Sequence, residues 1–156
     1  MDILFVADAL SSFKIYKDTT FAMMREARKR GHCVFACEPR HLVWRRGSVV
    51  QADVQGITLT GTATDTETQS EWFKVDSYSR MSLKDFGAVV MRKDPPFDSE
   101  FFYATHLLEQ AEREGARVFN KPRALRDHPE KLAIMEFPQF IASTLVTRDP
   151  EAMERI

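Results

Sequence analysis

The stretch from Met91 to Asp98, with the sequence MRKDPPFD, carries charged residues suited to binding a small anion. Arg92 and Lys93 directly follow a short apolar run typical of a buried strand, so Arg92 can present its guanidinium fork to a carboxylate. The two prolines stiffen the turn and preorganise what it holds, although the sequence does not say whether an X-Pro bond in residues 94–96 is cis. Taken alone, the string predicts a stiff charged turn and nothing more.

A second candidate, Lys17 to Met23, leads from the first apolar run into a predicted helix. The backbone N–H groups of its first turn, together with the helix dipole, suit a carboxylate. Spacing alone favours a simpler interpretation, in which Asp18 caps the helix and Lys17 is solvated. Both candidates lie beyond the carboxyl ends of predicted strands, where open parallel sheets bind ligands.

Sequence motifs for phosphate, dinucleotide or metal binding are not found. Gly56 and Gly61 have the spacing of a phosphate loop, but Thr-Ala follows where Lys-Ser or Lys-Thr is required. No strand leads into G-x-G-x-x-G, and the histidines at 32, 41, 106 and 128 lack metal-ligand spacing. The sequence therefore predicts no metal ligand and no catalytic residue in this chain.

The elements that position the two candidates follow from hydrophobic patterning and capping residues. Four apolar runs predict buried strands, at 3–7, 33–37, 88–91 and 117–119. Two amphipathic stretches that end at glycine predict helices, at 19–30 and 99–114. Strand, helix and strand joined by short connections form βαβ units, which place parallel strands side by side. We therefore expect an α/β fold with three layers and an open, mostly parallel sheet.

The remaining segments are less regular. Residues 42–59 predict a hairpin that turns at Arg46-Gly47, and the Thr- and Asp-rich residues 60–70 predict a surface loop. Two short helical segments follow Pro122, and 143–147 is expected to be a strand. Asp149 and Pro150 begin a further helix that has only six residues after the proline, which we interpret as a truncated element.

Composition narrows the class of protein. With 156 residues, 44% hydrophobic and 29% charged, the chain can form one domain plus part of a second. The formal net charge of −1 does not favour nucleic acid, and no apolar run is long enough to span a membrane. Cys33 and Cys37 are four residues apart in one predicted strand, too far for a disulfide, so both are expected to be reduced and buried. Without a secretory signal, these features predict a cytoplasmic protein.

The string MRKDPPFD resembles the signature of prokaryotic glutathione synthetase. Further matches occur in the family's order and spacing and together cover nearly the whole chain: Lys17-Asp18 with Phe21-Ala22-Met23, Asn120-Lys121-Pro122, Leu125-Arg126-Asp127, Glu130-Lys131-Leu132, and Thr144 to Arg148. The chain departs from the family pattern in residues 42–80 and 134–142, where no motif of the resemblance lies.

The resemblance implies an enzyme that joins glycine to γ-glutamylcysteine with ATP and Mg²⁺ or Mn²⁺, through an acyl phosphate. It implies a pre-ATP-grasp domain over residues 1–126 and the truncated start of an ATP-grasp domain over residues 127–156. The implied roles are peptide-substrate binding by Lys17, Asp18, Thr19, Arg92 and Asp94, and contact of Lys131 with an ATP phosphate. A homo-oligomer, a tetramer by resemblance, is also implied. We expect most of the ATP and metal ligands downstream of Ile156, and therefore no ligase activity and weak ATP binding from these residues alone.

Two other functions remain open from the sequence. One is a different ATP-grasp ligase that joins a carboxylate to an amine, and the other is a non-catalytic binding or oligomerisation module. A dense apolar group just after Lys131 is expected to lack cover within these 156 residues; its members are Ile134, Met135, Phe137, Phe140 and Ile141.

Overall fold

The computed structural model describes residues 1–61, 72–129 and 131–153. Its centre is a sheet of seven strands, with helices on both faces. The strands are β1 (Asp2–Val6), β2 (Cys33–Cys37), β3 (Leu42–Val43), β4 (Gln51–Leu59), β5 (Phe73–Ser82), β6 (Ala88–Met91) and β7 (Val118–Phe119). The α-helices are α1 (Thr19–Lys29), α2 (Ser99–Arg113), α3 (Pro122–Asp127) and α4 (Pro150–Met153). Short 3₁₀ turns lie at Leu10–Ser12, Pro39–His41, Leu83–Asp85, Ala133–Glu136 and Pro138–Phe140.

The sheet is mixed, which corrects the expectation of a mostly parallel one. Strands β2, β1, β6 and β7 are parallel neighbours, whereas β4 is antiparallel to β2, β3 and β5. The hairpin expected at Arg46-Gly47 is confirmed, with Ser48 N donating to Arg45 O at 3.0 Å and Gly47 at a φ of 81°. Strand β5 was not predicted, and residues 62–70 of the expected loop lie outside the described residues.

Both long helices begin where the sequence predicts, because each has an aspartate at its N-cap. Asp18 accepts a hydrogen bond from Phe21 N at 2.8 Å, and Asp98 accepts one from Phe101 N at 2.9 Å. Gly31 and Gly115 follow these helices with φ of 77° and 104°, a conformation that glycine adopts at little cost. The βαβ units β1–α1–β2 and β6–α2–β7 are thus set by local sequence.

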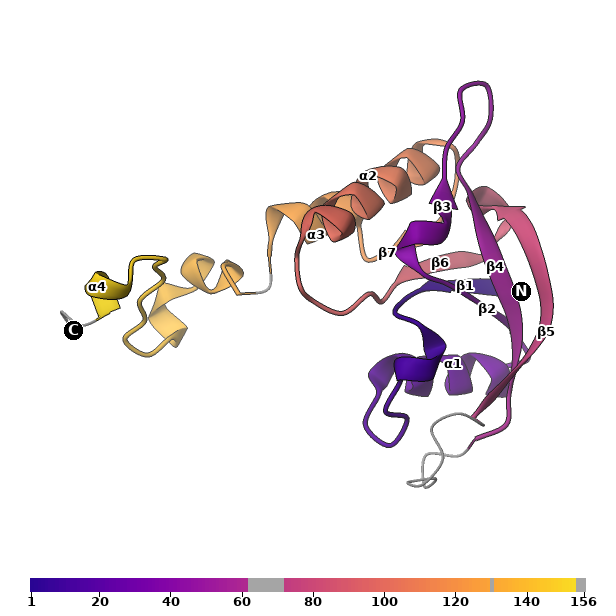
Figure 1. The fold of residues 1–156 in the computed structure, drawn as a ribbon, viewed down its shortest axis with the longest axis horizontal. Helices are drawn as coiled ribbons and strands as arrows, with labels where there is room; N and C mark the ends of the chain where they lie inside the picture. The colour runs from indigo at the N-terminus through magenta and orange to yellow at the C-terminus, as the bar shows by residue number, and fades with distance from the viewer. Residues whose placement is uncertain (62–71, 130, 154–156) are drawn as a thin grey trace.

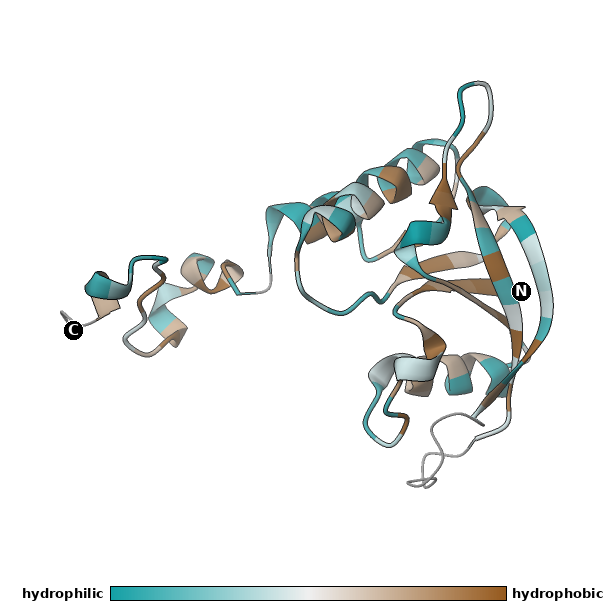
Figure 2. Ribbon diagram, in the orientation of Figure 1, coloured by the Kyte–Doolittle hydropathy of each residue, from teal (hydrophilic) through white to brown (hydrophobic). Residues whose placement is uncertain are grey.

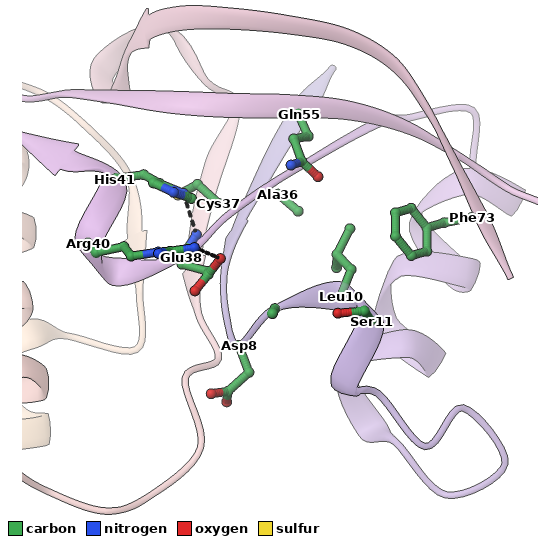
Figure 3. Close-up of a pocket in the computed structure, with 11 residues that line it drawn as sticks. Asp8, Leu10, Ser11, Ala36, Cys37, Glu38, Arg40, His41, Gln55 and Phe73 are labelled. Carbon is green, nitrogen blue, oxygen red and sulfur yellow. Dashed lines mark hydrogen bonds and ion pairs between the residues drawn. The ribbon is translucent and has the colours of Figure 1, made fainter. Parts of the chain in front are cut away.

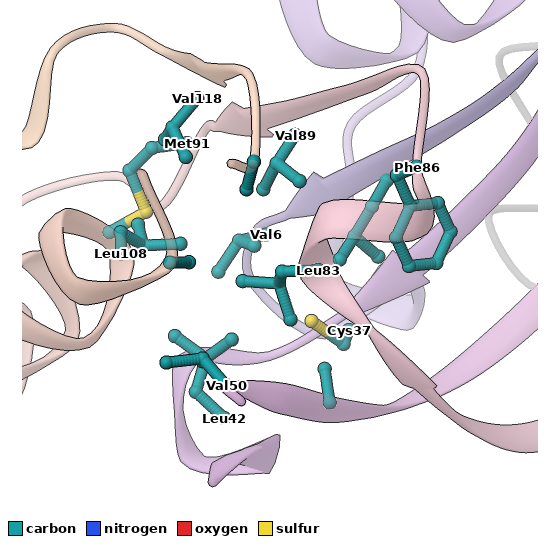
Figure 4. Close-up of a cluster of buried hydrophobic side chains, with 14 of the residues drawn as sticks. Val6, Cys37, Leu42, Val50, Leu83, Phe86, Val89, Met91, Leu108 and Val118 are labelled. Carbon is teal, nitrogen blue, oxygen red and sulfur yellow. The ribbon is translucent and has the colours of Figure 1, made fainter. Parts of the chain in front are cut away.

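Strand β1 supplies residues to two separate cores, because its side chains alternate between the faces of the sheet. Leu4 and Val6 pack on the α2 side, whereas Ile3 and Phe5 pack on the α1 side. Figure 4 shows the α2-side core, where Leu108 meets strand residues, and Figure 2 shows hydrophobic residues concentrated in the central strands. The three expected layers are therefore confirmed.

The two cysteines differ in environment. Both are free thiols, as expected, but only Cys37 is buried, and the exposure of Cys33 corrects the prediction that both are covered. Cys33 is the first residue of β2, and it is the exposed residue of that strand. Burial raises the pKa of the Cys37 thiol to about 12, so this thiol stays protonated near neutral pH.

The C-terminal residues 131–153 extend away from the α/β body and do not have the predicted strand at 143–147 (Figure 1). Asp149 does cap α4, accepting from Glu151 N at 3.0 Å. No start of an ATP-grasp domain is seen in the described part of this segment. In the apolar group after Lys131, Met135, Phe137 and Phe140 are exposed and both isoleucines are half-buried, as expected.

Helix α3 is held on α2 by Arg126. Its guanidinium donates to Thr105 Oγ1 at 3.2 Å and forms an ion pair with Glu109. This contact stabilises the ionised form of Glu109, because the hydrogen bond from Arg126 lowers the pKa of the Glu109 carboxyl. Arg126, together with the Lys121–Glu112 ion pair and the packing of Leu125 on the α2-side core, thus fastens the start of the C-terminal region to the α/β body. In the described residues, no helix could span a membrane.

We predict that Leu108→Ala lowers the free energy of unfolding of the 156-residue chain by about 2–5 kcal/mol, because Leu108 is fully buried between α2 and the sheet. Urea denaturation followed by circular dichroism measures the change. Tyr103→Ala, on the exposed side of the same helix, is the control and should change the value by only about 0.5 kcal/mol. Equal effects of the two substitutions would contradict the packing described here.

Candidate functional site

The parallel strands create a natural binding position between β1 and β6. From β1 the chain crosses through α1 to β2 on one side, whereas β6 crosses through α2 to β7 on the other. The two crossovers therefore leave in opposite directions, which opens a crevice at the carboxyl ends of β1 and β6. The predicted residue Arg92 directly follows β6, and Asp8 lies two residues beyond β1.

Arg92 is fixed in this crevice by both neighbouring elements. Its backbone N–H donates to Val6 O at 2.7 Å, which extends the pairing of β6 with β1. Its side chain donates from Nε to Thr20 Oγ1 at 3.0 Å and from Nη2 to Thr19 Oγ1 at 2.6 Å. The helix capped by Asp18 thus positions the two hydroxyls that orient the guanidinium.

The charge of Arg92 is not neutralised by these contacts, because both side-chain partners are hydroxyls. Among the residues that the structure describes, Arg92 forms no ion pair with a carboxylate. A half-buried guanidinium with oriented N–H groups left over favours an anionic ligand, and a carboxylate matches its fork.

Asp8 holds the diproline turn against β1. Its Oδ1 forms an ion pair with Lys93 Nζ at 2.8 Å, and its Oδ2 accepts from Asp94 N at 3.0 Å. Lys93 also donates to Asp94 O at 2.9 Å, and the Pro95-Pro96 bond is cis. One carboxylate therefore fixes the two residues that follow Arg92.

These residues surround a cavity of about 200 Å³. Its lining is Asp8, Ser12, Phe13, Asp18, Thr20, Arg92, Asp94 and Pro95. We call it the β1/β6 cavity. A guanidinium and three carboxylates line the same small space, so it can receive a ligand that carries both signs of charge.

The structure brings together most, but not all, of the predicted site residues. Asp18, Arg92 and Asp94 line the β1/β6 cavity, and Thr19 contacts it through Arg92. Lys17 does not line it, and its ammonium lies 5.7 Å from the centre of the Tyr16 ring. Lys131 is exposed in the segment beyond α3.

Sequence reasoning missed Asp8, Thr20 and Lys93. A signal for Asp8 was present, since an aspartate just after the apolar run of β1 must lie at the same sheet edge as Arg92. Thr20 was hidden because a threonine in a first helical turn has no distinctive spacing. Lys93 was noted only as a neighbour of Arg92.

Two larger cavities continue along the same sheet edge. One, of about 310 Å³, lies beyond β1 and β2 and shares Asp8 with the β1/β6 cavity (Figure 3). The other, of about 250 Å³, lies beyond β6 and β7 and shares Arg92, Asp94 and Pro95 with it. We call them the β1/β2 cavity and the β6/β7 cavity.

Comparison with known proteins gives a consistent result. Residues 1–126 match the family model described as "Prokaryotic glutathione synthetase, N-terminal domain". The chain is 51% identical over 153 residues to glutathione synthetase of Ralstonia nicotianae, and 48% identical over 147 residues to that of Neisseria meningitidis serogroup A. The alignments cover 98% and 94% of this chain but 45% of each relative, so the chain spans about half the length of the curated relatives it matches.

We predict that Asp8→Ala accelerates hydrogen exchange of the Asp94 backbone amide by roughly 10–100-fold, because this amide donates to the Asp8 carboxylate and sits on an exposed residue. Amide exchange by NMR on the 156-residue chain measures it. Asp8→Asn keeps an acceptor of the same size and should give an intermediate rate. The Phe21 amide, bonded to Asp18, should keep its rate in both variants. If the Asp94 amide exchanges as fast in the unsubstituted protein as in Asp8→Ala, the hydrogen bond between this amide and Asp8 does not form in solution.

Proposed function

This chain belongs to the prokaryotic glutathione synthetase family, whose N-terminal domain it contains, and on that premise we propose that the whole protein joins glycine to γ-glutamylcysteine with ATP. In this reaction the cysteinyl carboxylate attacks the γ-phosphorus of ATP, and ADP leaves. The glycine amine then attacks the acyl phosphate, losing a proton as phosphate departs. The product is the tripeptide glutathione.

One observation carries the proposal for this chain, namely the oriented and unneutralised guanidinium of Arg92 at the β1/β6 crevice. A dipeptide with carboxylates at both ends is the kind of ligand that such a group binds. We propose that Arg92 binds a carboxylate of γ-glutamylcysteine, and that Thr19 orients the guanidinium. Asp18 and Asp94 line the same cavity, and we assign their carboxylates to the peptide N–H of the dipeptide. We assign Lys17 to the path by which the substrate enters.

The proposed reaction also uses ATP and Mg²⁺, but fewer residues of this chain are assigned to them than to the dipeptide. We assign Lys131 to an ATP phosphate, which an ammonium suits as a compact point charge. In the described residues, no group of three His, Cys, Asp or Glu side chains is arranged to hold a metal ion, so we assign no Mg²⁺ ligand here. When bound, Mg²⁺ and positioned cations offset the charge that develops on the transferred phosphoryl group. We further propose that the protein forms a homo-oligomer.

The alternatives considered from the sequence are disfavoured on specific grounds. A different ATP-grasp ligase does not account for the family match over residues 1–126 together with MRKDPPFD at the crevice. A non-catalytic module does not account for the similarity to glutathione synthetases, which are 51% and 48% identical over 98% and 94% of this chain.

We predict that Arg92→Ala lowers kcat/KM for γ-glutamylcysteine by roughly 10–100-fold in the whole protein, because a charge-assisted carboxylate contact of about 1.5–3 kcal/mol is lost. Steady-state kinetics at saturating ATP and glycine measures the loss. Arg45→Ala, at the exposed hairpin tip, is the matched control and should leave the kinetics unchanged. Unchanged KM and kcat in Arg92→Ala would remove this residue from the site.

A second prediction distinguishes an effect on ATP binding from an effect on peptide binding. Lys131→Ala should raise KM for ATP by about 10-fold, from the loss of one charged contact, and should change KM for γ-glutamylcysteine little. Initial rates with each substrate varied in turn give both constants. A larger effect on the peptide KM than on the ATP KM would show that Lys131 does not face the nucleotide.

A further inference from the structure

The β1/β2 cavity is larger than the β1/β6 cavity and is separated from it by Asp8. Figure 3 shows its lining: Leu10 and Ser11 follow β1, Glu38, Arg40 and His41 follow β2, and Gln55 and Phe73 belong to β4 and β5. The carboxylate of Asp8 points away from this group, toward the diproline turn that it clamps. The charges that face this cavity are therefore those of Glu38 and Arg40.

Glu38 and Arg40 offer one charge of each sign. Arg40 Nη2 lies 2.8 Å from Glu38 Oε1, and the two side chains are 65% and 28% exposed, so N–H groups of Arg40 and Oε2 of Glu38 remain available. His41 Nδ1 accepts the Glu38 backbone N–H at 3.2 Å, which leaves Nε2 to carry the proton of the neutral ring.

Neutral hydrogen-bonding groups complete the lining. Within the part of the chain that the structure describes, the Ser11 hydroxyl and the Gln55 amide make no hydrogen bond. Leu10 and Ala36 give the cavity a buried apolar wall. A lining with one acid, one base and neutral donors suits a zwitterion, because each ligand charge finds its opposite. It is poorly suited to a polyanion such as a nucleotide phosphate.

The sizes and positions of the three cavities indicate how a dipeptide lies across the sheet edge. Small-molecule sites have volumes of about 300–1,000 Å³, and the β1/β6 cavity falls below that range, so a dipeptide must reach into a neighbouring cavity. The β6/β7 cavity is lined by His128 and Pro129, which lead into Lys131. The end of the substrate that reacts with ATP therefore belongs on that side, and the other end belongs on the β1/β2 side.

We propose that the β1/β2 cavity binds the α-amino-acid end of the γ-glutamyl group, with its carboxylate on Arg40 and its ammonium on Glu38. The cysteinyl carboxylate then lies at Arg92, toward Lys131. This inference rests on the proposed function and fixes the direction in which the dipeptide lies across the sheet edge.

The test crosses two variants with two substrate analogues in the whole protein. Arg40→Gln should lower kcat/KM for γ-glutamylcysteine by roughly 10–100-fold, but by only about 2-fold for 4-aminobutanoyl-cysteine, which lacks the α-carboxylate. Glu38→Gln should show the complementary pattern, with a large loss for γ-glutamylcysteine and a small one for glutaryl-cysteine, which lacks the α-amino group. A general disturbance of the fold would reduce the rates with all substrates alike, so the crossed pattern is specific to the contacts.

The control is Arg45→Gln, on an exposed arginine that lines none of these cavities, and it should leave all rates unchanged. Equal losses on the dipeptide and on the matching analogue, or no loss on either, would overturn the proposed direction. Failure of the proposed function is a separate result, in which the unsubstituted protein forms no glutathione from γ-glutamylcysteine, glycine and ATP.

Discussion

The parallel pairing of β1 with β2 on one side and β6 on the other is the constraint on which the site depends. This pairing is rigid because β1 is covered on both faces, with Leu4 and Val6 in one core and Ile3 and Phe5 in the other. A strand that is covered on both faces cannot shift its register by one residue without exchanging the two sets of side chains. The positions of Asp8 and Arg92, each just beyond the end of its strand, are therefore fixed by packing some distance from the crevice.

The charged residues at the crevice determine which ligands it can bind. Asp8 neutralises Lys93 and anchors the Asp94 backbone, so one acid and one base are used to hold the turn. Arg92 is held by hydroxyls instead, which orient its fork without neutralising it. A preorganised charge of this kind loses little conformational entropy when its ligand binds. The turn thus contains one charge that is used for structure, that of Lys93, and one charge that is left available for binding, that of Arg92.

The features that could be predicted from the sequence are those set by local interactions. Asp18 and Asp98 mark helix starts because a cap needs only the backbone N–H groups of the next turn. The strand predicted at 143–147 was wrong, because these residues have strand-like composition but pair with no strand in the part of the chain that the structure describes. The sheet is mixed because β4 and β5 are antiparallel. Pairing between strands that are distant in the sequence cannot be predicted from a short segment of sequence.

The candidate site shows the same division between local and long-range information. The position of Arg92 at the sheet edge was predictable, because it directly follows a recognisable buried strand. Its partners Thr19 and Thr20 lie more than 70 residues earlier in the chain, and only the fold brings them to the guanidinium. Asp8 clamps a turn 86 residues away for the same reason. The family resemblance named Thr19 as a site residue, but its contact with Arg92 became clear only from the structure.

The two halves of the proposed site differ in how firmly this chain holds them. Arg92 is fixed by β1, β6 and α1, whereas Lys131 comes after Arg126, one of the residues that fasten α3 to α2. Beyond that point Phe137 and Phe140 are 53% and 81% exposed, so the segment that carries Lys131 gains little burial from the α/β cores. Elements with few buried apolar contacts are the ones whose positions change most readily. The half that is proposed to bind the peptide is therefore preformed by the α/β fold, and the position of Lys131 relative to Arg92 must be set by contacts outside the two cores.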